Sequence, residues 1–134
     1  MEKIVIDTSV AVKWFVNEPK SQQAVTILSH HTQKKILIVV PAILRLELIN
    51  GLFFSYHFGS SQLSESLISL ESLELQFFST RDIDLNNVTA LMEKFTIASY
   101  DACFLSLAKG LNCPLITNDR RHHLRKMYRK IEYL

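Results

Sequence analysis

Four acidic residues stand where an ionised carboxylate is costly unless a cation lies nearby. They are Asp7, Glu47, Asp101 and Asp119. Asp7 ends the apolar run that begins at Ile4, and Asp119 ends the run that begins at Leu115. Both runs are typical of short buried strands, and ligands of open α/β sheets gather at the carboxyl ends of strands. Glu47 interrupts an otherwise apolar helical stripe, where an unpaired charge is expensive.

The joint placement of the four acids favours a divalent metal site. Like charges at one sheet edge would repel one another unless a cation offset them. Each acid also has a simpler role. Asp7 and Asp119 can cap helices that follow them, and Asp101 suits the first turn of a helix. Glu47 can form an internal ion pair, with Arg45 or another base.

Oxygen ligands without Cys or a suitably placed His select Mg²⁺ or Mn²⁺ over zinc. Such a site suits hydrolysis of phosphodiester bonds, with the four carboxylates sharing metal binding and the orientation of a water. The hydroxyls of Ser9 and Thr117 are placed to support the carboxylates or metal-bound water by hydrogen bonds. Both hydroxyls equally suit ordinary turns.

Positive charge is concentrated after Asp119. Residues 120–134 hold six Lys or Arg against one acid, whereas residues 1–119 hold nine against twelve. A basic patch beside a metal site is what an RNA backbone would require, so we predict RNA contacts there. The predicted RNA-binding residues are Arg120, Arg121, Arg125 and Lys126. The alternative is a solvated helix face.

Four of the five histidines form two adjacent pairs, at 30–31 and 122–123. Neighbours on a helix point about 100° apart, so neither pair makes a metal clamp of the kind formed at positions i and i+4. We therefore predict no catalytic role for any of them. His122 and His123 can still contact phosphate, because they lie within residues 120–134, which we call the basic segment.

Apolar runs alternate with helical patterns along the whole chain, which is typical of an α/β fold with a parallel sheet covered on both faces. The five predicted strands are Ile4–Ile6, Ile36–Val40, Leu73–Phe78, Leu115–Thr117 and Ile131–Leu134. The predicted helices lie near Val10–Val16, Ser21–His31, Pro41–Tyr56, Ser61–Ser72, Leu85–Phe95, Tyr100–Leu111 and Arg121–Tyr128. With 134 residues, the chain is expected to form a single domain spanning 1–134.

Composition excludes several other classes. No apolar run approaches the roughly 20 residues that span a bilayer, and no signal peptide is recognised, so we expect a cytoplasmic protein without membrane contact. The chain has only three Gly, and no glycine-rich phosphate loop. Its two cysteines suit buried reduced thiols rather than a disulfide or zinc framework.

The chain resembles PIN-domain ribonucleases, and is most similar to the small VapC-type toxins of prokaryotic toxin–antitoxin pairs. The resemblance covers essentially the whole chain and depends on four motifs in order. They are Ile4–Ser9 leading into Val12–Phe15, Pro41 with Glu47 and Asn50, Tyr100–Ala102 with Leu107–Ala108, and Leu115–Asp119.

This resemblance implies a five-stranded parallel sheet between helices, a PIN-like three-layer sandwich. It also implies Mg²⁺ or Mn²⁺ dependence and endonucleolytic cleavage of RNA, with tRNA or rRNA as candidate substrates. A homodimer and a cognate antitoxin that covers the site are further implications. By the same resemblance, the four acids form the metal site, with Ser9 and Thr117 as polar neighbours.

Three other functions remain open on the sequence. One is a solitary PIN nuclease in RNA processing, and another is a non-catalytic module that binds RNA through the basic segment. The third is a phosphatase that uses Asp7 as a nucleophile. The phosphatase is disfavoured because Ser9 stands where that class carries a second acid.

Overall fold

The computed structural model describes residues 1–134 and is built around a five-stranded sheet in which all paired strands are parallel. The strand order is β3-β2-β1-β4-β5. The strands are β1 (Glu2–Ile6), β2 (Ile36–Pro41), β3 (Gln76–Phe78), β4 (Leu115–Thr117) and β5 (Ile131–Tyr133). The order reverses between β1 and β4, so the carboxyl ends of these two strands border the crevice where α/β sheets bind ligands.

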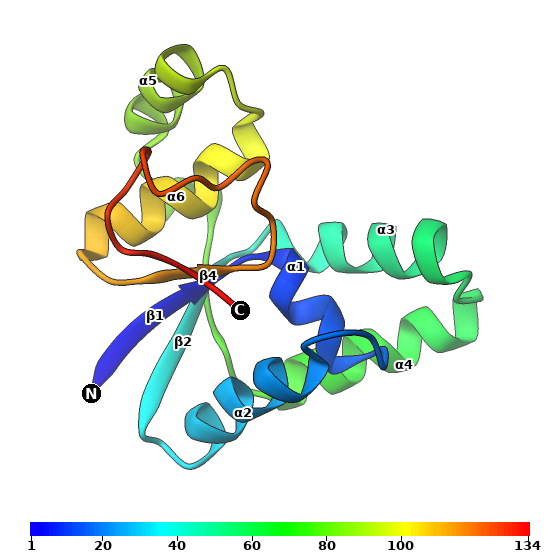
Figure 1. The fold of residues 1–134 in the computed structure, drawn as a ribbon. Coiled ribbons are helices and arrows are strands. Elements are labelled where there is room, and N and C mark those ends of the chain that lie inside the picture. Colours follow the sequence, from blue (N-terminus) through cyan, green and yellow to red (C-terminus); the bar gives the residue numbers. More distant parts are fainter.

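Helices cover both faces of the sheet, as the alternating pattern predicts. They are α1 (Thr8–Ala11), α2 (Ser21–Thr32), α3 (Leu44–Tyr56), α4 (Ser60–Ser72), α5 (Leu85–Phe95) and α6 (Ser99–Leu111), with short 3₁₀ turns η1 (Val12–Trp14) and η2 (Thr80–Asp82). Figure 1 shows α5 and α6 on one side of the sheet and α2 on the other, with α3 and α4 projecting as a pair. The predicted α/β sandwich is therefore confirmed.

The central strands are apolar because both of their faces are covered. Val5 and Ile6 of β1 and Ile38 to Val40 of β2 are fully buried, which is the pattern of parallel strands between helix layers. Helix α6 adds Phe104 and Leu105 to this core, and Leu115 of β4 completes it. Asp7 directly follows the buried end of β1, and Asn118 directly follows the end of β4.

The predicted helix over Arg121–Tyr128 is wrong, because residues 119–130 form a series of turns. Buried residues at His123, Met127 and Ile131 are four apart and imitate a helical stripe. A helix would instead place like charges at i and i+4, for example Arg121, Arg125 and Arg129, which is unfavourable. Turns allow the buried side chains to reach the core while the basic ones spread over the surface.

Other boundaries differ by a few residues. Pro41 does not begin a helix but ends β2, opposite Phe78 of β3, and α3 starts only at Leu44. The predicted strand from Leu73 is shorter, because Glu74 has a positive φ of 56° and delays β3 until Gln76. No helix is long and apolar enough to cross a membrane.

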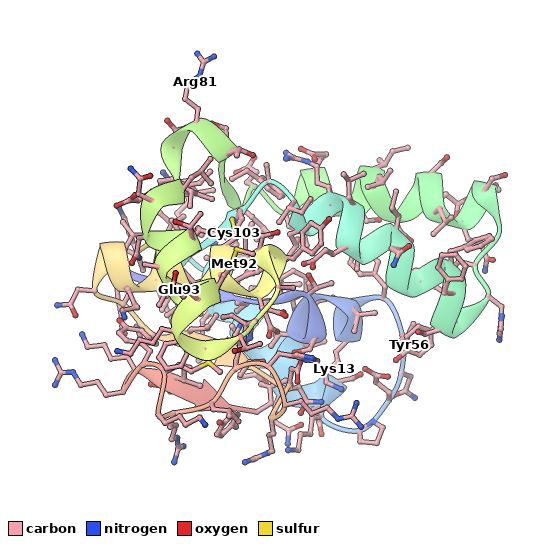
Figure 2. The ribbon with its side chains drawn as sticks, turned by 90° about the horizontal axis from the view of Figure 1, so that it is seen from above. Lys13, Tyr56, Arg81, Met92, Glu93 and Cys103 are labelled. Carbon is pink, nitrogen blue, oxygen red and sulfur yellow. The ribbon has the colours of Figure 1, made fainter.

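A buried lysine ties the segment after η1 to the end of α3. Lys13 is 4% exposed, and its Nζ donates to Glu18 Oε1 at 2.9 Å and to the Pro19 carbonyl at 2.8 Å. The hydroxyl of Tyr56 donates to the other oxygen of Glu18, and Figure 2 labels Lys13 and Tyr56. The hydrogen bond to Glu18 raises the pKa of Tyr56 to about 12.

Another buried polar residue, His31, joins three elements. Its Nδ1 accepts from the backbone N–H of Ile38 at 3.1 Å, and its Nε2 donates to the Leu73 carbonyl at 2.9 Å. The ring therefore connects α2 to β2 and to the residue after α4. This histidine therefore has a structural role.

Replacing His31 by leucine should lower the free energy of unfolding. The change leaves a buried N–H and a carbonyl unpaired, each of which costs about 1–3 kcal/mol. His30→Leu is the matched control, because His30 is exposed on the same helix. Urea unfolding monitored by circular dichroism measures both. Equal stabilities of the two variants would contradict the structural role.

Candidate active site

Asp7 is the centre of a hydrogen-bond network at the carboxyl edge of the sheet. It is 5% exposed, and four donors converge on its carboxylate. Oδ1 accepts from the backbone N–H and the hydroxyl of Ser9, while Oδ2 accepts from the hydroxyl of Thr117 and from His123 Nδ1 at 2.8 Å. A carboxylate has about four acceptor positions, so the side chain of Asp7 is fully engaged.

Ser9 and Thr117 also hold the neighbouring backbone. The Asn118 N–H donates to Ser9 Oγ at 2.8 Å, and the Asp119 N–H donates to Thr117 Oγ1 at 2.9 Å. Each hydroxyl thus links Asp7 to the segment that leaves β4. These contacts are of the kind expected from the sequence. The engagement of Asp7 also disfavours it as a nucleophile, which leaves the phosphatase alternative without support.

Asp119 directly precedes the basic segment. Its Oδ1 accepts from the backbone N–H groups of Arg121 and His122, and its Oδ2 faces His122 Nδ1 at 2.8 Å. Burial alone would raise the pKa of Asp119, but these hydrogen bonds and the His122 charge lower it below its ordinary value. Asp119 therefore caps a turn, as its alternative role predicts, although no helix follows.

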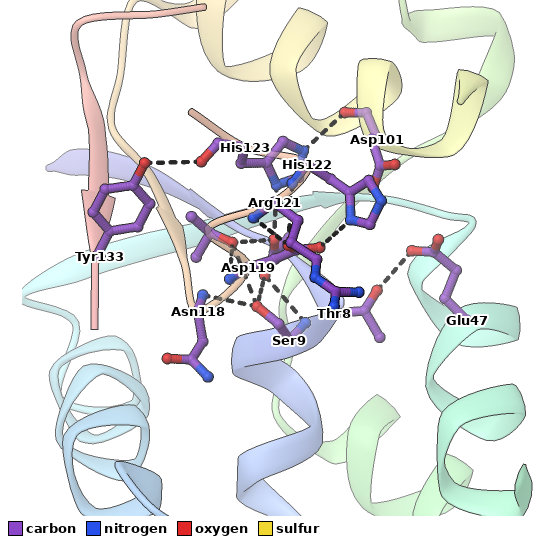
Figure 3. Close-up of polar contacts among 12 residues, drawn as sticks. Thr8, Ser9, Glu47, Asp101, Asn118, Asp119, Arg121, His122, His123 and Tyr133 are labelled. Atoms are coloured by element: carbon purple, nitrogen blue, oxygen red, sulfur yellow. Dashed lines mark hydrogen bonds and ion pairs between the residues drawn. The ribbon is translucent and has the colours of Figure 1, made fainter. Parts of the chain in front are cut away.

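Glu47 reaches the site from α3. Thr8 donates its hydroxyl to Glu47 Oε1 at 2.6 Å, across the gap between α1 and α3 that Figure 3 shows. The alternative pairing with Arg45 is not formed, because Arg45 binds Glu71. Burial raises the pKa of Glu47; the Thr8 hydrogen bond opposes this shift, and the charges of Asp101 and Asp7 add to it.

Asp101 faces the same edge from the first turn of α6. Burial raises the pKa of its carboxyl group, and the charges of Asp119 and Asp7 raise it further against the opposing effect of two histidines. Asp7 and Asp101 thus raise the pKa of Glu47, and Asp7 and Asp119 raise that of Asp101, so each of the four acids lies close to at least one other. The pKa of Glu47 and that of Asp101 are both raised, and a cation bound nearby would lower them by favouring the ionised carboxylates.

His123 is the site residue that sequence reasoning missed. It is 1% exposed, and its two ring nitrogens face Asp7 and the Asp101 carbonyl, the latter at 3.1 Å. Burial alone would lower its pKa, but the hydrogen bond and charge of Asp7 raise it above the ordinary value. The available signal was the four-residue spacing of His123, Met127 and Ile131, which marks His123 as inward-facing.

Thr8 was also missed, because a hydroxyl between Asp7 and Ser9 looks like another turn residue. Of the four predicted RNA-binding residues, Arg120 and Arg121 directly follow Asp119 in the chain. Arg120, Arg121, Arg125 and Lys126 are all exposed. Figure 3 shows Arg121 extending past the carboxylates, which places a cation at the mouth of the site.

The donor chemistry of this cluster suits a hard divalent cation, because its negatively charged ligands are all carboxylate oxygens. As the side chains stand, no three His, Cys, Asp or Glu groups are close enough to surround one ion. Mg²⁺ commonly retains several waters and uses only one or two carboxylates, so the arrangement fits a partly hydrated ion.

The sequence of the chain matches the PIN-domain family model over residues 4–130. The chain belongs to the PIN-domain family. No curated protein matches it in sequence. The identification expected from the four motifs is thus confirmed at the level of the family.

Among solved structures, the PIN fold of this chain is similar to those of VapBC toxin–antitoxin proteins. VapBC2 from Rickettsia felis, bound to promoter DNA, is 17% identical with a TM-score of 0.72, covering 98% of each chain. DNA-bound VapBC from Salmonella typhimurium is 17% identical with a TM-score of 0.71, covering 99% of this chain and 98% of that one. VapC20 from Mycobacterium tuberculosis, a sarcin–ricin loop cleaving toxin, is 11% identical with a TM-score of 0.66, covering 89% and 92%.

The burial of Asp101, together with its repulsion from Asp119 and Asp7, leads to a prediction for the metal-free protein. A carboxyl whose pKa is higher folded than unfolded destabilises the fold once ionised, and this cost disappears as pH falls through the folded-state pKa. Asp101→Asn should therefore raise the melting temperature in EDTA at neutral pH, and the gain should shrink in acid. Glu93→Gln, on the exposed side of α5 in Figure 2, removes an isolated charge as the control. A less stable Asp101→Asn variant would contradict the electrostatic reading.

Proposed function

We propose that this PIN-domain protein is a metal-dependent endoribonuclease that hydrolyses RNA phosphodiester bonds in the cytoplasm. The observation that carries the proposal is the convergence of four carboxylates beside an exposed basic segment, with the pKa of both Glu47 and Asp101 raised. The likeness of the fold to VapC structures supports a toxin of a type II toxin–antitoxin pair.

Mg²⁺ or Mn²⁺ is the proposed cofactor, bound directly by one or two of Asp7, Glu47, Asp101 and Asp119 and through waters by the others. The bound ion would polarise the scissile phosphate and offset the charge that develops on the departing oxygen. Because Asp7 already accepts four hydrogen bonds, one donor must withdraw when an ion contacts it. The hydroxyls of Ser9 and Thr117 can rotate, which makes them suitable for this adjustment.

Glu47 is proposed to orient the attacking water. Thr8 occupies Oε1 and fixes the side chain, which leaves Oε2 to accept a proton from water. A raised pKa makes this carboxylate a stronger base at neutral pH than an ordinary glutamate. Thr8 acts through Glu47 and is a positioning residue.

RNA is proposed to lie along the basic segment. Arg120, Arg121, Arg125 and Lys126 would neutralise backbone phosphates on either side of the scissile bond, so affinity should weaken as salt rises. A tRNA or rRNA is the proposed substrate class. Contacts to the backbone carry no base specificity, so base recognition would come from other surfaces.

Asp101→Asn is the sharpest test of the activity, because this variant should gain stability and cannot lose cleavage by unfolding. Purified protein is incubated with a mixed tRNA and rRNA pool in Mg²⁺, Mn²⁺ or EDTA, and the products are resolved on gels. We expect discrete metal-dependent products from the wild type and a loss of roughly 10²–10⁴-fold in the variant. Asp7→Asn should also be inactive.

Glu93→Gln serves as the matched control, prepared in the same way, and should cleave at the wild-type rate. Cleavage that persists in Asp101→Asn or in EDTA would indicate a contaminant and remove the proposal. Salt-sensitive RNA binding without products in either metal would favour the non-catalytic module instead.

A protein partner is proposed to cover the site. An apolar groove of about 600 Å³ runs beside Glu47, lined also by Ile43, Leu46, Ile49, Asn50, Phe53, Phe54, Leu63 and Tyr100. Phe54 is 69% exposed and Leu46 is 62% exposed, which is unusual for a monomer surface. We propose that a cognate antitoxin segment occupies this groove, and that the toxin is a homodimer.

Phe54→Ser should weaken the antitoxin complex by about tenfold or more, since buried aromatic residues commonly contribute over 1 kcal/mol to interfaces. The partner to test is the product of any small open reading frame that neighbours the gene, and titration calorimetry measures the affinity. Ile68→Ser is the control, because Ile68 is 72% exposed and does not line the groove. Equal affinities would place the antitoxin elsewhere. Sedimentation of the toxin alone tests the homodimer.

A further inference from the structure

Tyr133 of β5 contacts both the basic segment and the backbone of the carboxylate network. The guanidinium carbons of Arg120 and Arg125 lie 4.1 and 5.1 Å from the centroid of its ring. Its hydroxyl donates to the carbonyl of His123 at 3.0 Å, a contact visible in Figure 3. One aromatic side chain therefore touches two predicted RNA-binding cations and the residue that binds Asp7.

Stacking on Tyr133 gives the two arginines defined positions. An exposed arginine normally samples many rotamers, and ordering such a side chain on binding costs conformational entropy. A guanidinium over a tyrosine ring is attracted to its negative face, which also offsets repulsion between the two cations. The arginines are thereby prearranged to contact a phosphate backbone.

The hydroxyl of Tyr133 acts on a different part of the site. Its hydrogen bond fixes the His123 carbonyl, while the His123 ring contacts both Asp7 and the Asp101 carbonyl. Strand pairing adds a second connection, because Tyr133 is the register partner of Thr117, whose hydroxyl donates to Asp7. The position of Tyr133 is therefore tied to that of the central carboxylate.

We propose that Tyr133 is a positioning residue that joins RNA-backbone binding to the geometry of the carboxylate site. The ring orients Arg120 and Arg125 toward phosphate, and the hydroxyl holds His123 against Asp7. This inference rests on the proposed ribonuclease function. It predicts that the two parts of one side chain affect two separable steps, binding and cleavage.

Two substitutions separate these parts. Tyr133→Phe keeps the ring and loses the hydroxyl, so we expect unchanged RNA affinity and a single-turnover cleavage rate about five- to tenfold lower at saturating RNA. Tyr133→Leu loses both, so its dissociation constant should also rise by roughly tenfold. Affinity is measured in EDTA by fluorescence anisotropy of a labelled single-stranded RNA oligonucleotide, between about 50 and 200 mM salt.

Tyr128→Phe is the matched control. Tyr128 lies in the same segment, and its hydroxyl donates to the Cys113 carbonyl at 2.8 Å, away from the arginines and His123. The control loses a comparable hydrogen bond without touching the site, so its cleavage rate should equal that of the wild type. Equal rates in Tyr133→Phe and Tyr128→Phe would overturn the role of the hydroxyl. Wild-type affinity in Tyr133→Leu would overturn the role of the ring.

A measurement without RNA keeps this inference distinct from the ribonuclease proposal. The Nε–Hε resonances of Arg120 and Arg125 should be shifted by the Tyr133 ring in the wild type and in Tyr133→Phe. They should return to ordinary positions in Tyr133→Leu, and unshifted resonances in the wild type would refute the stacking. Failure of the wild type to cleave any RNA would count against the proposed enzyme, whatever these resonances show.

Discussion

The carboxylate of Asp7 is the constraint on which the rest of the site depends. It follows the buried end of β1 and is itself only 5% exposed, so the protein must supply most of its hydrogen bonds. Four donors do so, and they come from the turn into α1, from β4 and from the segment after β4. The hydrogen bonds to this one carboxylate thus connect distant parts of the chain at the same edge of the sheet.

The remaining acids are arranged by different physics. Asp119 is stabilised by backbone N–H groups and by His122, whereas Glu47 and Asp101 are partly buried among like charges. The site therefore combines carboxylates that are satisfied within the protein with carboxylates that are not. The hydrogen bonds of Asp7 and Asp119 hold the site together, whereas the negative charges of Glu47 and Asp101 are not fully offset. This is the state expected of a cation site before the cation binds.

Much of this arrangement could be predicted from the sequence. Strands that are buried on both faces have continuous apolar runs, so the positions of Asp7 and Asp119 at strand ends followed directly. The contacts of Ser9 and Thr117 followed from their nearness in sequence to those acids. His123 did not, because its role depends on a turn segment whose buried residues have helical spacing and whose charges forbid a helix.

Thr8 and Tyr133 illustrate a second limit. Thr8 contacts Glu47, 39 positions away in the chain, and Tyr133 contacts Arg120 and His123 across the turns that precede β5. Such pairs arise from the order of the strands and the path of the loops, and no local pattern encodes them. The family resemblance likewise pointed to the four acids, Ser9 and Thr117 but not to Thr8 or Tyr133, because motifs record residue types and spacings rather than contacts.

The irregular path of residues 119–130 has a physical purpose that a helix could not serve. In a helix, the direction of every side chain is set by the helical repeat. Placing one residue inward would therefore also fix the directions of its neighbours. Turns free each residue from that repeat. His123 and Met127 can enter the core while the cations between them stay exposed, and Asp119 can cap the first turn without leaving the site. Exposed cations and a buried support for Asp7 are thereby supplied by one short segment, so they lie close together.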